Sequence, residues 1–432
     1  MANLIVRPPA TATELATHFQ GDLLAFEQRD DPVEAAHWQE STFNAPGFRL
    51  EQLRCVFLDG QQAGGCIVHE RELRIGQARL LTGCVGGVFT RPEFRNQGVA
   101  AALMRDVIEL ARARHYALLL LDGIPNFYYR YGYCDVFDLS VQEIFREAIT
   151  ALPASPYSVR PVMEQGAAAL LALYERSFGT YTGSFVRSLE QQRYQLQQRS
   201  PDTANLSWFA VDAQERVRGY LVLDKKDQRA ALEFAADDWE AALVLLQHHA
   251  HLLEGPEAPQ SLRYLLPDDA LVTQWLAEHL QVANTANSEH SFYHWTIMGQ
   301  TYRQNPAGWM GRVVDVAALA QAMLPAWQER WQRSLARWSG NIVLNIHTDT
   351  PTEQYVVLHI AKDTVQVVDK PSTDAAHVVN LTAQTLVQLL FGYRSIAQLA
   401  PTMEPALPQD VPTVLSILFP AGNTWITRSD WF

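Results

Sequence analysis

Apolar residues recur at three- and four-residue steps after the stretch RPEFRNQG that begins at Arg91, namely Val99, Leu103, Val107 and Leu110. This period predicts an amphipathic helix over residues 98–114. The next segment, ALLLL at residues 117–121, is a continuous apolar run of the kind that forms a strand buried on both faces. Residues 78–90 are also strand-like. The order strand, helix, strand predicts parallel strands, with the turn at residues 95–100 at the carboxyl end of the first.

Upstream, the pattern predicts a helix from Glu14 to Phe26, opened by a capping box at Thr11-Ala-Thr-Glu14. Strands are expected at residues 54–58 and 65–69, with Asp59-Gly60 as a hairpin turn.

An internal repeat indicates more than one domain. Val6-Arg7-Pro8 opens one strand–helix unit and Val159-Arg160-Pro161 opens another, and residues 208–222 resemble the strand–turn–strand region of the first unit. Two copies of one α/β unit are therefore expected. From Pro306 onward the pattern changes, and it predicts a separate α+β domain with a helix at 317–335, strands at 341–347, 355–360 and 364–368, and a helix at 382–391. The expected domains are residues 1–150, 151–300 and 301–432.

The composition narrows the function classes. The 432 residues are 48% hydrophobic and 19% charged, and the net charge of -13 argues against a nucleic-acid binder and fits a cationic partner such as an amine. The N-terminus lacks a secretory pattern, and no apolar run reaches the length of a membrane span. The four cysteines have no CxxC spacing, so we expect reduced thiols in a cytoplasmic protein. No metal site is expected. The histidines at 248, 249 and 251 lack a second set of ligands at metal spacing, and those at 290 and 294 lie among aromatic residues, which indicates strand packing.

The turn at residues 95–100 has the features of an anion site. The first amides of a helix are unpaired and carry partial positive charge, so they bind anions such as phosphates. Gly98 permits close backbone approach, Ala100–Ala102 leave the first turn unobstructed, and Arg95 adds a full charge. A well-capped surface turn is the alternative interpretation.

Arg95-Asn-Gln-Gly98-Val-Ala100 resembles the Arg/Gln-x-x-Gly-x-Gly/Ala signature of the GCN5-related N-acetyltransferases (GNATs), and Phe127-Tyr128-Tyr-Arg-Tyr-Gly132-Tyr133 resembles their FYxxxGF/Y box. The resemblance covers residues 1 to about 150 and implies acetyl-CoA as cofactor. It implies that the preceding strand, at Val88 and Phe89, holds the acetyl and pantetheine portion. It assigns the pyrophosphate of coenzyme A to the turn, which consists of Arg95, Asn96, Gln97, Gly98, Val99 and Ala100.

The whole chain resembles the Eis (enhanced intracellular survival) branch of that family. The duplicated unit, residues 381–392 and the ending Ser429-Asp-Trp-Phe432 carry this resemblance. It implies the fold class α/β (α+β), with two tandem GNAT-like domains followed by a sterol-carrier-like domain, and a homo-oligomer such as a hexamer. The second copy reads Ala236-Asp-Asp-Trp-Glu240 where a phosphate turn would fall, and carboxylates repel a pyrophosphate. One active site per chain is expected.

Amine acetylation needs a neutral amine, a polarised thioester carbonyl and a protonated leaving thiolate. Residues 82–90 contain no carboxylate that could act as base. The Eis resemblance implies that the C-terminal carboxylate of Phe432 is the base and that Tyr133 is the acid. Tyr128 is the alternative acid, because related enzymes use the first tyrosine of the box, and Asp122 is the reserve candidate for the base.

The acidic residues Glu27, Asp30 and Asp31 follow the first helix, and the resemblance implies that they border a pocket for cationic amines. Asp122 is also expected to contact the substrate. A solvated loop is the alternative. Trp431 stands where the family can carry an acidic residue that helps to bind polycations, which weighs against aminoglycosides.

The sequence therefore favours an acetyl-CoA-dependent N-acetyltransferase acting on a small-molecule or peptide amine: an aminoglycoside-like compound, a polyamine or a lysine side chain. The alternative is an apolar-ligand binding protein of sterol-carrier type with a vestigial acetyltransferase domain. The C-terminal domain is expected to deliver Phe432 to the active site.

Overall fold

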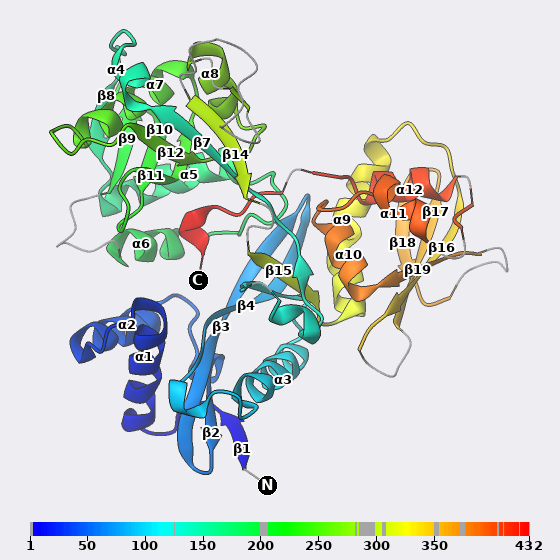
Figure 1. Cartoon of the computed structure of the whole chain (residues 1–432). Coiled ribbons are helices and arrows are strands. Elements are labelled where there is room, and N and C mark those ends of the chain that lie inside the picture. Colours follow the sequence, from blue (N-terminus) through cyan, green and yellow to red (C-terminus); the bar gives the residue numbers. More distant parts are fainter. Residues whose placement is uncertain are drawn as a thin grey trace.

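A computed structural model describes residues 3–124, 126–198, 206–280, 283–284, 299–304, 308–349, 354–370, 376–403, 406–408, 410–422 and 424–431 (Figure 1). Over these residues the chain is a mixed α/β protein with sheets of seven, eight and four strands. No helix among them is both long enough and apolar enough to cross a membrane. All four cysteines are buried and free, as expected for reduced thiols.

The first sheet contains the unit predicted around Gly98. Its strand order is β1-β2-β3-β4-β5-β15-β6. The strands are β1 (Leu4–Arg7), β2 (Leu53–Leu58), β3 (Gln61–Ile75), β4 (Ala78–Thr90), β5 (Leu118–Asp122), β15 (Trp309–Val313) and β6 (Cys134–Asp135). Strands β4 and β5 are parallel and are joined through α3 (Val99–Ala113). The predicted parallel pair and its amphipathic helix are therefore confirmed.

Helices α1 (Ala12–Glu27) and α2 (Pro32–Asn44) pair with each other, and α1 packs on β3 and β4. The hydroxyl of Thr11 caps α1 by accepting a hydrogen bond from the amide of Glu14 at 3.1 Å. The reciprocal half of the predicted capping box is wrong, because the Glu14 carboxylate instead accepts from the guanidinium of Arg7 and the amide of Ala10. A cation is the stronger donor to a carboxylate.

The second sheet repeats the pairing scheme of the first. Its order is β13-β14-β7-β12-β11-β10-β9-β8, and β11 and β12 form a parallel pair like β4 and β5. The strands are β7 (Leu139–Phe145), β8 (Ser158–Pro161), β9 (Ser207–Val211), β10 (Val217–Leu223), β11 (Ala230–Ala236), β12 (Ser261–Leu265), β13 (Ala283–Asn284) and β14 (Gly299–Gln304). The helices of this region are α4 (Arg146–Thr150), α5 (Ala167–Phe178), α6 (Leu189–Gln198), α7 (Trp239–Leu252) and α8 (Leu271–Leu280).

Sheet membership does not follow the sequence boundaries at residues 150 and 300. Strand β7 precedes residue 150 but lies in the second sheet, and β15 follows residue 300 but lies in the first. Each strand pairs antiparallel with the second member of a parallel pair, β7 with β12 and β15 with β5. Long-range pairing of this kind leaves no local signal in the sequence.

The third unit has the predicted α+β pattern. Its sheet has the order β18-β17-β16-β19, and α9 packs on β17 and β18. The elements are α9 (Val316–Arg333), β16 (Gly340–His347), β17 (Gln354–Ala361), β18 (Thr364–Val368), β19 (Ala376–Thr382), α10 (Ala383–Leu390), α11 (Ile396–Leu399) and α12 (Val411–Leu418). The expected helices and strands are confirmed within a few residues.

One cluster of buried apolar side chains runs through all three units, for example at Leu120, Tyr220 and Leu358. From α12 the chain returns to the other two units. Its last described segment, drawn red near the C label, includes the short helix η6 (Arg428–Asp430) and lies between α6 and β4 (Figure 1).

Candidate active site

The predicted phosphate turn leads directly into α3. Residues 95–98 are exposed, and Asn96 and Gly98 have positive φ angles of 61° and 81°. Gly98 is the N-cap of α3 and offers no side chain to the helix amides, and the first turn contains no acidic residue. The N-terminus of α3 therefore keeps its unpaired amides and partial positive charge for an anion. The exposed guanidinium of Arg95 lies in the same turn.

In the second sheet, the corresponding helix is α7, and a carboxylate side chain caps its N-terminus. The N-cap of α7 is Asp238, whose carboxylate accepts a hydrogen bond from the amide of Ala241 at 2.9 Å. Arg218 and Tyr157 donate to the same carboxylate. This helix terminus is already capped by an anionic side chain, in contrast to the N-terminus of α3.

Strand β4 is distorted where a donor substrate would lie. In the ladder with β3, Gly65 pairs with Phe89 but Ile67 pairs with Gly86, so β4 bulges at Gly87 and Val88. Gly87 has a φ of 57°, which favours glycine. The pairing of β4 with β5 ends at Val85 and Leu121, although β4 continues to Thr90. Val88 is half-buried and Phe89 is buried at this divergence, the place where parallel sheets bind ligands.

The two candidate acids lie together after β5. Tyr128 belongs to the short helix η3 (Tyr128–Tyr131), and its ring centroid is 6.0 Å from that of Tyr133. Burial raises the pKa of Tyr128 to about 12 and raises that of Tyr133 above its ordinary value. The hydroxyl of Tyr133 is buried and has no hydrogen-bond partner among the described residues. Both side chains therefore carry their proton at neutral pH.

Arg312 of β15 supports this tyrosine box and was not predicted from the sequence. Its guanidinium donates to the carbonyl oxygen of Tyr131 and to the carboxylate of Asp349 at 2.7 Å. The φ of Gly132 is 81°, which favours glycine, and a Cβ atom there would lie 1.9 Å from Nη1 of Arg312 and would displace that guanidinium. Burial dominates the pKa of Tyr133, and the charge of Arg312 opposes that rise. The residue is far from the box in sequence, so only the fold reveals the contact.

Asp22 is a further candidate that the sequence did not reveal. Helix α1 approaches β4 closely at Gly21, where a Cβ atom would lie 2.4 Å from the ring of Phe89. The next residue, Asp22, faces the bulge, and a Cβ atom on Gly87 would lie 3.0 Å from its Oδ1. That oxygen is buried and has no hydrogen-bond partner among the described residues. Burial raises the pKa of Asp22 to about 7. An acidic residue on the apolar face between Phe19 and Leu23 was the available signal.

The acidic residues after the first helix are partly engaged elsewhere. Glu27 forms an ion pair with Lys226, and Asp31 caps α2 by accepting from the amides of Val33 and Glu34. Asp30 is exposed. Of the three, only Asp30 has no interaction assigned to it in the described chain, so the solvated-loop alternative explains much of this group.

Asp122 ends β5 and pairs in the sheet with Trp309 of β15. The residue is exposed, yet partial desolvation of its carboxyl raises its pKa, and the charge of Arg428 opposes this rise. The residue therefore lies at the carboxyl end of the parallel pair, as predicted, beside a cation from the end of the chain.

Phe432 lies outside the described residues, but the residue before it does not. The ring of Trp431 meets that of Trp309 edge-on, with centroids 5.3 Å apart, and the guanidinium carbon of Arg428 lies 3.3 Å from the centroid of Trp431. The last described residue is thus packed against β15, next to the end of β5.

His290 and His294 also lie outside the described residues. His249 is buried and has its two ring nitrogens next to the hydroxyl of Tyr264 and the carbonyl of Gln228, so it is a core residue. Within the described ranges no group of three or more His, Cys, Asp or Glu side chains is arranged to hold a metal ion.

Comparison with known proteins identifies the first unit. Residues 8–135 match the family model of the GNAT acetyltransferase domain. No curated protein matches the chain by sequence. A probable N-acyltransferase from Enterococcus faecalis V583 has a similar structure, with 18% identity, a TM-score of 0.71 and 100% of both chains covered.

Two further solved structures extend this similarity over the chain. A GCN5-related N-acetyltransferase from Anabaena variabilis is 14% identical, with a TM-score of 0.70 and 100% of both chains covered. Eis1 from Mycobacterium abscessus is 15% identical, with a TM-score of 0.61, and the match covers 99% of this chain and 100% of that one. At these identities the structures share a fold.

The chain therefore carries a GNAT acetyltransferase domain, it is an acetyltransferase enzyme, and its acetyl donor is acetyl-CoA. The sequence predictions of the domain, the enzyme class and the cofactor are confirmed.

Proposed function

We propose that the protein acetylates a primary amine of a small molecule or peptide by direct attack of the amine on the thioester. We also propose that it is built like an Eis protein, with tandem GNAT-like domains at residues 1–150 and 151–300 and a sterol-carrier-like domain at 301–432, and that it works as a cytoplasmic homo-oligomer. The observation that carries the proposal is the uncapped N-terminus of α3 beside the divergence of β4 and β5.

The residues present fit the donor substrate. When bound, acetyl-CoA supplies an acetyl group activated as a thioester. The amides that follow Gly98 and the guanidinium of Arg95 would hold its pyrophosphate, since no side chain caps this helix. The bulged backbone at Val88 would hold the acetyl and pantetheine portion, because β4 runs on beyond its last pair with β5.

Three groups are proposed to transfer the protons. The terminal carboxylate of Phe432 accepts a proton from the attacking amine, and the packing of Trp431 against Trp309 supports this position for the chain end. A terminal carboxylate is a weak base, with an ordinary pKa of about 3.5. Asp22, with its pKa raised to about 7, is the better proton acceptor at neutral pH and would share this task. Tyr133, or else Tyr128, protonates the departing sulfur.

The acceptor is proposed to be cationic before reaction. The net charge of -13 and the buried carboxyl of Asp22 at the β4 bulge favour an ammonium over an anionic acceptor. The candidate acceptors remain aminoglycoside-like compounds, polyamines and lysine side chains.

The apolar-carrier alternative has less support. A cavity of about 470 Å³ lies between the first sheet and the third unit, but its lining includes Arg112, Arg312, His347 and Asp349. Charged walls do not suit a sterol-like ligand.

Thiol release from acetyl-CoA against a panel of amines tests the proposal. We expect turnover with one class of primary amine, and loss of turnover with retained coenzyme A binding in a variant extended by one glycine after Phe432. Equal turnover in both proteins would remove the terminal carboxylate as base. Absence of turnover with every amine would contradict the proposed acceptor class.

A further inference from the structure

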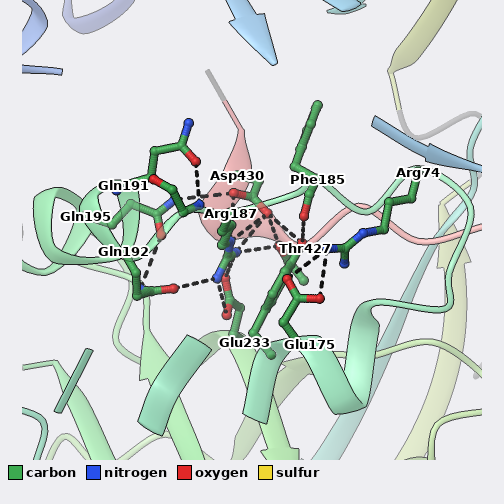
Figure 2. Close-up of polar contacts among 12 residues, drawn as sticks. Arg74, Glu175, Phe185, Arg187, Gln191, Gln192, Gln195, Glu233, Thr427 and Asp430 are labelled. Carbon is green, nitrogen blue, oxygen red and sulfur yellow. Dashed lines mark hydrogen bonds and ion pairs between the residues drawn. The ribbon is translucent and has the colours of Figure 1, made fainter. Parts of the chain in front are cut away.

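A buried cluster of charged side chains includes Asp430, which precedes Phe432 by two residues. Figure 2 shows Arg187 between Glu233 of β11 and Asp430 of η6. The side chains of these three residues are 1%, 1% and 0% exposed, respectively. They come from three separate parts of the sequence. The loop that carries Arg187 also contacts a fourth part, strand β3.

The loop before Arg187 is attached to the first sheet. The amide of Val186 donates to the carbonyl of Glu72, and the amide of Arg74 donates to the carbonyl of Ser184, both at 2.9 Å. Leu73 of β3 also forms a bridge with Phe185. Because β3 is the neighbour of β4, the backbone that holds Arg187 is fixed relative to the strand that bears the bulge.

The guanidinium uses its donors on both carboxylates. Arg187 donates to Asp430 from Nε at 3.1 Å and from Nη2 at 2.8 Å, and it donates to Glu233 from both terminal nitrogens. Its face lies 3.6 Å from the ring centroid of Tyr174. Burial alone would lower the pKa of Arg187, but the two carboxylates raise it well above its ordinary value. Arg187 therefore keeps its positive charge inside the protein.

Asp430 has further partners in addition to Arg187. The hydroxyl of Thr427 donates to it at 2.8 Å, the hydroxyl of Tyr174 lies at 3.3 Å, and the amide of Gln195 donates at 3.3 Å. The carboxylate is fully buried, and the positive charges of Arg187 and Arg71 keep its pKa below its ordinary value despite burial. Terminal segments normally fray unless they are held by contacts. This segment is held by Asp430, because both of its carboxylate oxygens accept hydrogen bonds.

Stability alone is a weak reason for such a cluster. Replacing buried ion pairs with apolar side chains is often neutral or stabilising, and in some proteins a buried polar or ionic group instead fixes one geometry. The geometry specified here is that of the tail. The amide of Asp430 donates to the carbonyl of Thr427 at 3.0 Å, and that of Trp431 donates to Arg428 at 3.2 Å. This turn sends Trp431 onto Trp309, beside the end of β5.

We propose that the Arg187–Asp430 pair, backed by Glu233, holds Trp431 beside the end of β5 and so positions the chain end for its proposed role as the base in acetyl transfer. The second unit thereby controls catalysis in the first without binding a substrate. Arg187, Glu233 and Asp430 are positioning residues in this scheme, and it rests on the proposed function.

The test compares Asp430→Asn with Asp212→Asn. Asp212 is also a buried carboxylate paired with an arginine, Arg216, at 2.8 Å, but it lies at the β9–β10 turn. Four quantities are measured on the full-length protein: kcat and KM with the best amine, the affinity for coenzyme A, and the rate at which carboxypeptidase releases Phe432. We expect Asp430→Asn to lower kcat on the order of 100-fold, since small misplacements of reacting groups cost this much, with coenzyme A binding retained and release accelerated. Asp212→Asn should change none of these by more than about twofold.

Arg187→Lys is the milder variant if Asp430→Asn does not fold, because it keeps the charge and removes the two-pronged contact. It should accelerate release and lower kcat in the same direction. A normal kcat in either folded variant, or no change in release, would overturn the proposal. The glycine-extended chain separates the two ideas. If extension abolishes turnover while Asp430→Asn does not, the positioning role is wrong and the terminal base stands. If extension has no effect, the terminal base is wrong, and the positioning role falls with it.

Discussion

The ring of Trp431 packs edge-on against that of Trp309, with an interplanar angle of 84°. This contact joins the tail of the chain to β15, the strand that enters the first sheet from residues 309–313. The site at the end of β5 is therefore built from segments that are separated by most of the sequence.

Removal of the Trp431 ring should release the chain end. Trp431→Ala is expected to lower kcat about tenfold or more, while the dissociation constant for coenzyme A stays unchanged, because the ring touches β15 and not the phosphate turn. Trp338→Ala is a suitable control, since that indole packs on Gly340 of the third unit. An equal fall of kcat in both variants would show a general loss of stability and not a local effect.

Gly98 should be required by coenzyme A for its backbone conformation and position. Gly98→Ala forces a side chain into a left-handed conformation at a cost of about 1 kcal/mol and obstructs the approach to the α3 amides. Gly47 has a similar φ of 78°, and a Cβ atom there would have no neighbour within 4 Å, so Gly47→Ala is the matched control. Calorimetry should show weaker coenzyme A binding in Gly98→Ala alone, although both variants lose similar stability. Equal binding in both would contradict the phosphate site.

Local patterns predicted local structure well. The period of residues 99–110 gave the position of α3, and the apolar run at 117–121 gave β5, since both depend on near neighbours. The glycine and small residues of the turn likewise made the anion site visible before any fold was known.

Contacts between distant segments could not be predicted. Neither Arg312 under the tyrosine box nor Arg187 on Asp430 has a sequence signal, because each partner lies more than a hundred residues away. Asp22 was missed for a different reason. Its raised pKa arises from the close packing of α1 on β4, which depends on Gly21.

Asp22 should make stability depend on pH. Burial raises its pKa from 3.8 to about 7, so the folded state binds the proton more tightly than the unfolded state. The stability from this group is complete below about pH 4 and is lost as the pH rises to about 7. Asp22→Asn should therefore melt at a similar temperature to the parent at pH 4 and at a higher temperature at pH 8.

The same variant should lose activity, since an amide cannot accept the proton of the amine. The rise of kcat/KM with pH near neutrality should disappear in Asp22→Asn and persist in Glu215→Gln, which alters an exposed carboxylate of the second unit. If the melting temperatures of Asp22→Asn and the parent differ by the same amount at every pH, Asp22 is not the buried titrating group.

Tyr133→Phe should separate catalysis from stability. The hydroxyl is buried without a hydrogen-bond partner among the described residues, so its removal leaves no orphaned group and relieves a desolvation cost of about 1 kcal/mol or more. The folded protein should be equally or more stable, and the ring contact with Tyr128 should persist. If this hydroxyl protonates the departing sulfur, kcat should nevertheless fall on the order of 100-fold.

Tyr128→Phe is the matched comparison, because its hydroxyl lies in the same box and its pKa is also raised by burial. A large loss of kcat in Tyr128→Phe with a normal rate in Tyr133→Phe would reverse the assignment. Normal values of kcat in both variants would contradict the proposal that a tyrosine of this box protonates the sulfur.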